Sequence, residues 1–208
     1  MSLSLTEIDI NRRLAVAEQG PANSYAWDFS LPSDLWNEEP RPAAVLIPML
    51  VKENAWHVLF TLRTASLAEH SGQVAFPGGR ADPKDATPEE TALREAEEEI
   101  ALQPQDVRIL GRLKRLRTIT NYCISPVVGV FPWPYHFKLA RDEVSRVFTI
   151  PLDWLVDREN HEIRLRELPL PLSPVPVIYF KLYENELLWG VSAQITLNLL
   201  KALDIYHE

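Results

Sequence analysis

The chain has 208 residues, of which 46% are hydrophobic, and this fits one domain of generous size with a sizeable core. The formal net charge of −8 argues against a general nucleic-acid binder, which would usually carry a basic face. No apolar run approaches the roughly 20 residues that span a membrane, and the N-terminus lacks the apolar stretch of a signal peptide. The single cysteine, Cys123, cannot form an intramolecular disulfide. Together these features predict a cytoplasmic protein without membrane contact.

The N-terminal part of the sequence predicts a helix followed by an irregular arm. Residues 5–18 carry spaced apolar side chains among polar ones, a pattern that favours an amphipathic helix. Residues 19–42 are rich in Pro, Asn, Ser and Trp and predict a long arm, which Trp27 and Trp36 would pack onto the body. The arm could instead cover a subunit interface of a homodimer. We therefore divide the chain into residues 1–42, a helix and arm packed on the body, and a main domain at 43–208.

The main domain alternates short apolar runs with two stronger helical patterns. Residues 43–51 and 56–61 predict a hairpin with its turn at Asn54, and residues 73–76 predict a short extended segment. The later predicted elements are strands at 107–120, 122–131 and 143–150, a short helix at 151–156, a hairpin of 175–183 with 186–189, and a closing helix at 192–205. Strands interleaved with helices predict an α/β fold, a sandwich with a mixed sheet.

The best-marked element is a central helix at residues 88–101. Thr87 is suited to the N-cap, Pro88 to the first helical position, and Glu90 completes a capping box. Pro104 is expected to stop the helix. This helix carries six glutamates between residues 89 and 99, and glutamates late in a helix face the negative end of its dipole. Something positive should offset that cost, and a divalent metal is the obvious candidate.

Helical geometry separates these glutamates into two groups. At about 100° per residue, Glu95, Glu98 and Glu99 fall on one face, whereas Glu97 falls on the far side of the apolar stripe. That stripe, which is predicted to dock on the sheet, consists of Leu93, Ala96 and Ile100. Three carboxylates on one face suit hard cations that prefer oxygen ligands, such as Mg²⁺ or Mn²⁺.

Two neighbouring features favour a metal site over a solvated acidic surface. Arg94 precedes Glu98 by four residues, so it can pair with Glu98 and orient it. The Gly78–Gly79 turn lets the backbone approach the same centre. An ordinary acidic helix face remains the alternative on these features alone, but it explains neither the glycine pair nor the lone arginine.

The sequences FPGG (residues 76–79) and REAEEEIAL (94–102) resemble the Nudix box, G-x5-E-x7-R-E-U-x-E-E-x-G-U, in which U is a bulky aliphatic residue. Two departures stand out, because Ala86 lies where the box has Glu, and Ala101 replaces its last glycine. We expect the three-carboxylate cluster to survive both changes. We also expect the helix to end without a left-handed glycine, helped by Pro104. The resemblance implies a Nudix-type α/β/α sandwich with a mixed β-sheet.

Residues 59–85, LFTLRTASLAEHSGQVAFPGGRADPKD, resemble the extended signature of the coenzyme A pyrophosphatase branch of Nudix hydrolases. The one-residue-longer loop between Gly79 and Arg94 is also typical of that branch. The segment from Leu188 to Ala193 looks like its W-G-x-T-A sequence, so the resemblance covers roughly residues 43–200. Asp82 and Asp85 match the signature as well, and turn formation is at least as good an explanation for them as chemistry.

The resemblance implies roles for the residues around the box. Glu98 and Glu99 would be the leading metal ligands, with the Gly78 carbonyl as a further one. Glu95 would be a ligand or the base that orients water, and Arg94 would hold the cluster in shape. We do not separate base from ligand among the three glutamates, because coupled carboxylates titrate as a set.

Further residues are candidates for an additional carboxylate and for substrate contacts. Glu143 is the candidate carboxylate from a later segment, although it could be an ordinary polar residue at a strand edge. Arg63, His70 and Gly79 lie in the signature and could meet the substrate. Arg115 belongs to the one dense basic cluster, which consists of Arg112, Lys114, Arg115 and Arg117. In a continuous strand, Arg112 and Lys114 would share one face and Arg115 and Arg117 the other. One pair could bind the 3′-phosphate of coenzyme A, and an ordinary solvated basic strand is the alternative.

The resulting hypothesis is a metal-dependent hydrolase of the diphosphate bond in coenzyme A or its thioesters, with Mg²⁺ or Mn²⁺ as cofactor. A Nudix hydrolase of another nucleoside diphosphate derivative, such as ADP-ribose or NADH, is the first alternative. A Nudix-fold binding module without catalysis is the second, although such modules commonly lose box carboxylates that are all present here. The expected partner is a small-molecule substrate, not nucleic acid or a membrane.

Overall fold

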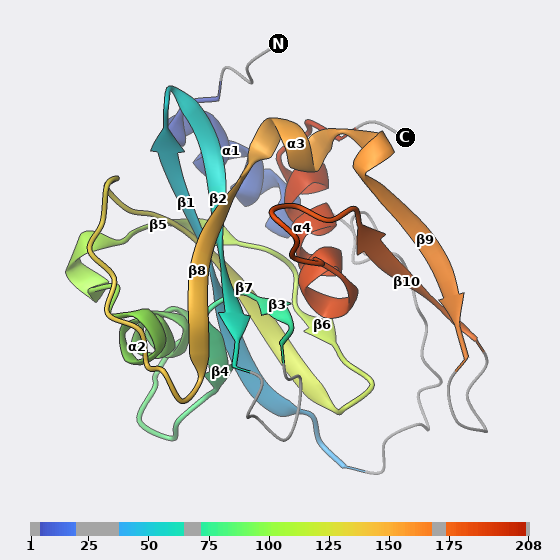
Figure 1. Cartoon of the computed structure of the whole chain (residues 1–208). Coiled ribbons are helices and arrows are strands. Elements are labelled where there is room, and N and C mark those ends of the chain that lie inside the picture. The colour runs from blue at the N-terminus through green and yellow to red at the C-terminus, as the bar shows by residue number, and fades with distance from the viewer. Residues whose placement is uncertain (1–4, 20–37, 65–71, 168–173, 207–208) are drawn as a thin grey trace.

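The computed structural model describes residues 5–19, 38–64, 72–167 and 174–206, and Figure 1 shows how the elements are arranged. The helices are α1 (Glu7–Gln19), α2 (Pro88–Ile100), α3 (Leu152–Val156) and α4 (Gly190–Ala202), with short 3-10 turns η1 (Pro104–Asp106) and η2 (Arg158–Asn160). The strands are β1 (Arg41–Lys52), β2 (Ala55–Arg63), β3 (Val74–Ala75), β4 (Gly78–Arg80), β5 (Arg108–Arg112), β6 (Leu116–Arg117), β7 (Tyr122–Val130), β8 (Val144–Pro151), β9 (His161–Arg166) and β10 (Val175–Phe180).

The main sheet is mixed, as the sequence predicts. Its central path runs β3-β2-β1-β7-β5, with β4 paired to β1, β6 to β7 and β8 to β2. β1 and β7 are parallel, and the other pairings in this sheet are antiparallel. The predicted hairpin of residues 43–51 and 56–61 is confirmed as β1 and β2. Glu53 and Asn54 form its turn with positive φ angles of 53° and 61°.

Helices cover both faces of the main sheet, which confirms the α/β/α fold class. Figure 1 shows α2 on one side, and α1 and α4 on the other. Successive side chains of a strand point to opposite faces, so β1 contributes to both layers. Ala44, Leu46 and Leu50 pack in the cluster of α2, whereas Ile47 and Met49 pack in the cluster of α1 and α4.

The N-terminal helix is an integral part of the second layer. The indole of Trp56 on β2 donates to the Leu5 carbonyl at 2.7 Å, and the Asn11 amide donates to the Leu110 carbonyl at 2.6 Å. Arg13 donates to the Leu203 carbonyl at the end of α4. The predicted helix at residues 5–18 therefore exists and packs on the body. The predicted arm falls mostly at residues 20–37, which lie outside the described residues together with Trp27 and Trp36.

The prediction of a single strand at 107–120 is wrong. The segment divides into β5 and β6, and residues 113–115 lie between them. The pairing of β5 with β7 shifts register between Ile109 and Gly111, and Gly111 has a φ of 153°. Residues 113–115 are in no strand, so the two-residue alternation of side chains is not continuous from Arg112 to Arg117. The predicted sharing of faces among the four basic residues therefore does not hold.

The predicted C-terminal hairpin also needs correction. The turn at Glu184 and Asn185 is present, with positive φ angles of 50° and 67°. However, β10 pairs along its length with β9, a strand that the sequence analysis did not predict. The segment after the turn contributes two isolated antiparallel bridges, Glu186 with Tyr183 and Trp189 with Tyr179, and no strand. β9 was missed although Ile163 and Leu165 alternate with charged residues, a pattern that is typical of a strand. The alternation is short, and both side chains are exposed in the structure.

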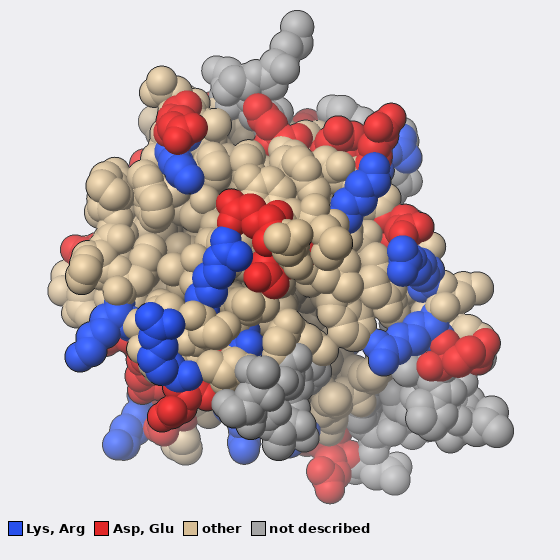
Figure 2. Space-filling view, viewed as in Figure 1, with Lys and Arg blue, Asp and Glu red and all other residues tan. Residues whose placement is uncertain are grey.

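Charged side chains are interspersed on the face that Figure 2 displays. The Lys and Arg side chains of the described residues lie scattered among acidic ones and do not merge into one broad basic area. No helix in the described ranges is both long and apolar enough to cross a membrane.

Candidate active site

The start of α2 is held by a capping arrangement close to the predicted one. The Glu90 amide donates to Thr87 Oγ1 at 3.2 Å, which confirms Thr87 as the N-cap. The Glu90 carboxylate accepts instead from the Ala86 amide at 2.7 Å, one residue before the cap. The helix ends at Ala101, which itself adopts the left-handed conformation with a φ of 56° although it is not glycine. Its amide donates to the Glu97 carbonyl at 2.8 Å, which helps to hold this conformation.

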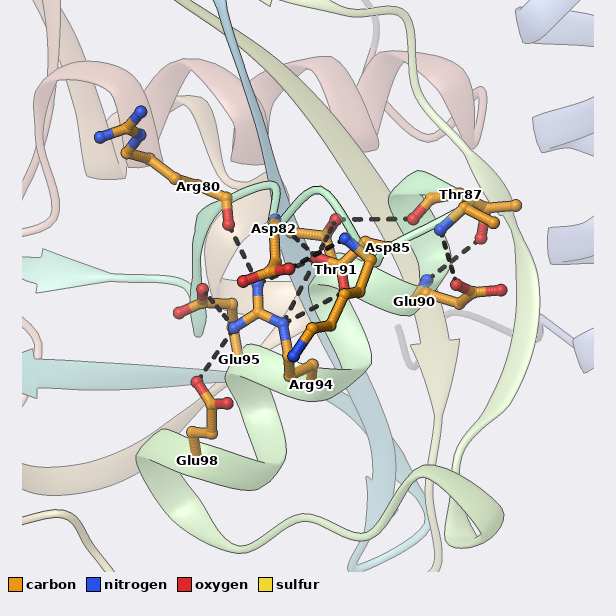
Figure 3. A network of polar contacts seen from close by, with 11 residues as sticks. Arg80, Asp82, Asp85, Thr87, Glu90, Thr91, Arg94, Glu95 and Glu98 are labelled. Atoms are coloured by element: carbon orange, nitrogen blue, oxygen red, sulfur yellow. Dashed lines mark hydrogen bonds and ion pairs between the residues drawn. The ribbon is translucent and has the colours of Figure 1, made fainter.

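Arg94 is the centre of the polar network on α2, as Figure 3 shows. Its Nη1 donates to Glu95 Oε1 at 2.8 Å and to Glu98 Oε2 at 3.0 Å, so the predicted pairing with Glu98 is present. Its Nη2 donates to the Arg80 carbonyl and to Asp85 Oδ2, each at 3.0 Å. One guanidinium thus ties the loop before the helix to two of the three candidate carboxylates.

Asp85 is the residue whose importance the sequence analysis missed. Its side chain is only 8% exposed, and it accepts from Arg94, from Thr91 Oγ1 at 2.9 Å and from the Asp82 amide at 2.9 Å. The hydrogen bond from Arg94 is the main cause that lowers the pKa of Asp85 to about 2. The signal in the sequence was that Asp85 immediately precedes Ala86, where the box has a carboxylate. A neighbouring acidic residue supplies the anchor for Arg94.

The three candidate carboxylates lie at different depths. The side chain of Glu98 is 60% exposed, that of Glu95 is 16% exposed and that of Glu99 only 4%. Glu97 is exposed, as is Glu98. The buried apolar stripe consists of Ala92, Ala96 and Ile100, so the prediction of Leu93 in this stripe is wrong. The docked face is thereby rotated toward Glu99, which is buried with the stripe.

Burial dominates the electrostatics of Glu99. Loss of solvation raises the pKa of Glu99 to about 8, because a buried carboxylate is penalised when charged. Arg63 and the Gly78 backbone amide oppose this rise, whereas the charges of Glu95 and Glu143 add to it. Glu99 Oε1 lies 3.9 Å from Arg63 Nη1, and Glu99 Oε2 is buried without a hydrogen-bond partner. The pKa of Glu95 is also raised by burial, against the opposing effect of Arg94.

The glycine pair brings the backbone of β4 against the carboxylates. A Cβ atom on Gly79 would lie 2.4 Å from Glu95 Oε2, so only glycine leaves room for that carboxylate. A Cβ atom on Gly78 would instead lie 2.5 Å from the Ala44 carbonyl oxygen on β1. The first glycine therefore permits close strand pairing, and the second permits close approach of a candidate ligand.

The remaining sequence candidates lie at differing distances from this cluster. Glu143 directly precedes β8, is exposed, and lies near enough to raise the pKa of both Glu95 and Glu99. Arg115 is exposed between β5 and β6, and within the described ranges no contact joins it to the carboxylates. Arg112 pairs with Glu89 at 3.2 Å and with Glu18 at 3.3 Å, away from the three candidate ligands. His70 lies outside the described residues.

The donor chemistry at the cluster fits a hard divalent cation. Within the part of the chain that the structure describes, Glu99 Oε2 is a buried carboxyl oxygen without a hydrogen-bond partner, and a cation beside it would favour its ionised form. Glu95 and Glu98 offer further oxygens on the same helix. Among the described residues, however, no three His, Cys, Asp or Glu side chains are grouped so that they could hold an ion as they stand. Arg94 engages Glu95 and Glu98 in this arrangement. Arg94 occupies only one oxygen of each, so Glu95 Oε2 and Glu98 Oε1 could serve a cation once the side chains draw closer together.

Comparison with known proteins places the fold and site in a family. A family model described as the NUDIX domain matches residues 40–168. The uncharacterized Nudix hydrolase NudL of Pectobacterium atrosepticum is 37% identical over 165 residues, which cover 76% of this chain and 80% of that protein. The protein of the same description from Citrobacter koseri is 39% identical over 159 residues, covering 74% and 79%.

The solved structures agree at the level of the fold. A MutT/nudix family protein from Enterococcus faecalis has a TM-score of 0.53 and 15% sequence identity, covering 81% of this chain and 64% of that one.

The family model and the sequence relatives show that the chain belongs to the Nudix hydrolase family. Its general activity is that of a Nudix pyrophosphatase, the hydrolysis of a diphosphate bond, with the substrate left open at this level.

Proposed function

We propose that the protein hydrolyses the diphosphate bond of coenzyme A or its thioesters in the presence of Mg²⁺ or Mn²⁺. The products are 3′,5′-ADP and 4′-phosphopantetheine, or its acyl form. The observation that carries this proposal is the segment 59–85, whose sequence resembles the coenzyme A pyrophosphatase signature. It supplies Arg63 from β2 and the Gly78–Gly79 turn of β4, and both lie against the carboxylates of α2.

The residues of α2 have separate roles in this proposal. Glu99, Glu98 and Glu95 hold the cation, with the Gly78 backbone as a further contact. The bound ion neutralises negative charge on the diphosphate and lowers the pKa of a water molecule. Arg94, itself anchored by Asp85, keeps Glu95 and Glu98 in reach of the centre. Glu143 is the proposed additional carboxylate, because its charge already acts on Glu95 and Glu99.

Substrate contacts complete the proposal. Arg63 meets a phosphoryl oxygen, and the absence of a side chain at Gly79 lets the diphosphate approach the turn. His70 and Arg115 remain proposed contacts for the rest of the substrate, Arg115 for the 3′-phosphate. The test of Arg115 is its replacement by Gln, which should raise KM for coenzyme A more than KM for dephospho-coenzyme A.

The substrate itself is tested with the purified full-length chain. Coenzyme A, acetyl-coenzyme A, ADP-ribose, NADH and nucleoside triphosphates are compared with Mg²⁺ or Mn²⁺, and the products are separated by chromatography. We expect release of 3′,5′-ADP from coenzyme A with the highest kcat/KM of the panel. No cleavage of coenzyme A beside brisk turnover of ADP-ribose or NADH would refute the branch assignment and leave the family assignment standing.

One observation keeps the non-catalytic binding module as a second candidate. Within the described residues, the carboxylates are engaged by Arg94 and do not form a ready metal shell. Replacing Glu98 by Gln separates the two functions, with Glu97→Gln on the same helix as the matched control. An enzyme should lose turnover by orders of magnitude with Glu98→Gln and keep it with Glu97→Gln. A binding module would show no turnover in any of the three proteins.

A further inference from the structure

Arg63 and Glu99 form an incomplete pair at the bottom of the site. The shortest contact between them, from Nη1 to Oε1, is 3.9 Å. A charge-assisted hydrogen bond between such groups normally closes to about 2.7–2.9 Å. Arg63 Nε and Glu99 Oε2 are both buried and have no hydrogen-bond partner. The two side chains therefore interact electrostatically, but they do not complete each other's hydrogen bonds.

Such an arrangement is costly if stability is its only purpose. A buried polar group without a partner destabilises a fold, and a charged one does so more strongly. The side chain of Glu99 is almost fully buried, and that of Arg63 is about a quarter exposed. These two unpaired atoms indicate two ligands of opposite charge. A cation would complete the contacts of Glu99 Oε2, and an anion would complete those of Arg63 Nε.

Arg63 is also the cation that faces this carboxylate from across the site. It lies at the end of β2, whereas Glu99 lies in the last turn of α2. The other guanidinium of the cluster, Arg94, is already bound to Asp85, Glu95 and Glu98. Glu143 adds negative charge near Glu99. A divalent cation entering beside Glu99 would therefore meet attraction from the carboxylates and repulsion from Arg63.

We propose that Arg63 is an internal counter-ion of Glu99 that a divalent cation displaces, and that the displaced guanidinium then receives the substrate phosphate. This inference rests on the proposed function, because it requires a metal at Glu99 and an anionic substrate. It goes beyond it by making Arg63 a competitor of the metal. The same residue thereby couples the two events, since metal binding frees the group that the substrate needs.

The test measures Mn²⁺ affinity directly, by electron paramagnetic resonance or isothermal titration calorimetry, on the full chain without substrate. Arg63→Gln and Arg63→Met remove the charge, and Met serves as the second neutral variant should Gln fold poorly. Arg63→Lys keeps the charge. Arg108→Gln is the matched control, because Arg108 is paired with Glu7 on the opposite layer and its loss changes net charge equally.

We expect the neutral variants to bind Mn²⁺ at least about tenfold more tightly, because a unit positive charge a few ångströms from a divalent ion repels it by at least that much even at the dielectric constant of water. Arg63→Lys and Arg108→Gln should bind as the unchanged protein does. At saturating Mn²⁺, the neutral variants should show a KM for substrate raised about tenfold, with a smaller change in kcat.

The contrary results are separable. If Arg63 merely holds Glu99 in place, the neutral variants will bind Mn²⁺ more weakly, and the inference is overturned. Unchanged Mn²⁺ affinity would overturn it as well. If the unchanged protein binds Mn²⁺ and Glu99→Gln weakens that binding, the metal site of the proposed function survives either result. Absence of Mn²⁺ binding by the unchanged protein would overturn both.

Discussion

The two helical layers of this protein treat buried polar groups differently. On the α1 and α4 side, the buried Thr196 donates to the Ser192 carbonyl at 2.8 Å, and Asn198 accepts from Gln194 at 2.9 Å. On the α2 side, Arg63 Nε and Glu99 Oε2 are buried and have no partner. The described residues contain one further such atom, Nδ1 of His161, whose ring packs against Phe180 and Tyr206 of the α1 and α4 cluster. The contrast between the layers therefore concerns Arg and Glu side chains.

The difference indicates which layer serves stability and which serves chemistry. The buried residues of α1 and most of those of α4 are apolar, whereas α2 buries a glutamate in addition to small and aliphatic side chains. A buried charge without a close partner destabilises a fold. The presence of such a charge in the α2 layer is explained if a bound ligand supplies the missing partner. Substitutions in the two layers should therefore affect different quantities.

The largest effect is expected for Glu99→Gln in the α2 layer. Turnover should fall by about a hundredfold or more, because the buried carboxylate is a proposed metal ligand. Thermal stability in the presence of a chelator should stay equal or rise, because the substitution removes a charge whose burial is unfavourable. Kinetic assays and thermal unfolding test the two halves. Loss of both activity and stability would show that Glu99 is primarily structural, and Glu97→Gln is the control.

The opposite outcome is expected for Leu14→Ala in the α1 layer. Leu14 is fully buried and packs against Gly111. Truncating it should cost about 2–5 kcal/mol in the free energy of unfolding, as is usual for a buried leucine. The kcat of the folded variant should not change. Chemical denaturation measures the cost, with Val16→Ala on the exposed side of the same helix as the control. A fall in kcat at a temperature where the variant is folded would break the contrast between the layers.

The adjacent glycines allow a finer comparison within the α2 layer. Alanine at Gly79 would meet the end of the Glu95 side chain, which can move at little cost to stability, so turnover should fall about tenfold. Alanine at Gly78 would meet the backbone of β1, which cannot move easily, so stability should fall by about 2 kcal/mol or more. Thermal unfolding and kcat/KM of both variants distinguish the two. Equal effects on both quantities would contradict these separate roles.

The smallest effect is expected for Asp85→Asn, and it depends on pH. Arg94 lowers the pKa of Asp85 from its ordinary value of 3.8 to about 2. A lowered pKa means that the stabilisation is present above the unfolded pKa and is lost as the pH falls through the folded pKa. Near neutral pH, the free energy of unfolding of the unchanged protein should exceed that of Asp85→Asn by about 1–2 kcal/mol. This difference should shrink below about pH 4 in chelator. Urea unfolding over this pH range is the measurement, and a constant difference would refute the role of the charge.

Local sequence patterns predicted those elements whose residues carry their own signals. Thr87, Pro88 and Glu90 predicted the start of α2, and Asn54 predicted the β1–β2 turn. Elements that depend on distant partners were not predicted. β9 carries only a short alternation of Ile163 and Leu165 with charged residues, and its partner β10 lies beyond residues 168–173 in the sequence. The break between β5 and β6 depends on their register with β7. Asp85 looked like a turn residue, because its partner Arg94 lies nine residues away in the sequence.

The amino-acid sequence by itself determined that Glu95, Glu98 and Glu99 share a face, because the helical period follows from backbone geometry alone. It also determined that Arg94 can reach Glu98, which is four residues away. Only the tertiary structure decided that Glu99 is buried while Glu98 is exposed, because depth depends on how α2 docks against the sheet. The same docking sets Glu99 opposite Arg63, since the two residues belong to different elements and meet only when α2 packs on the sheet.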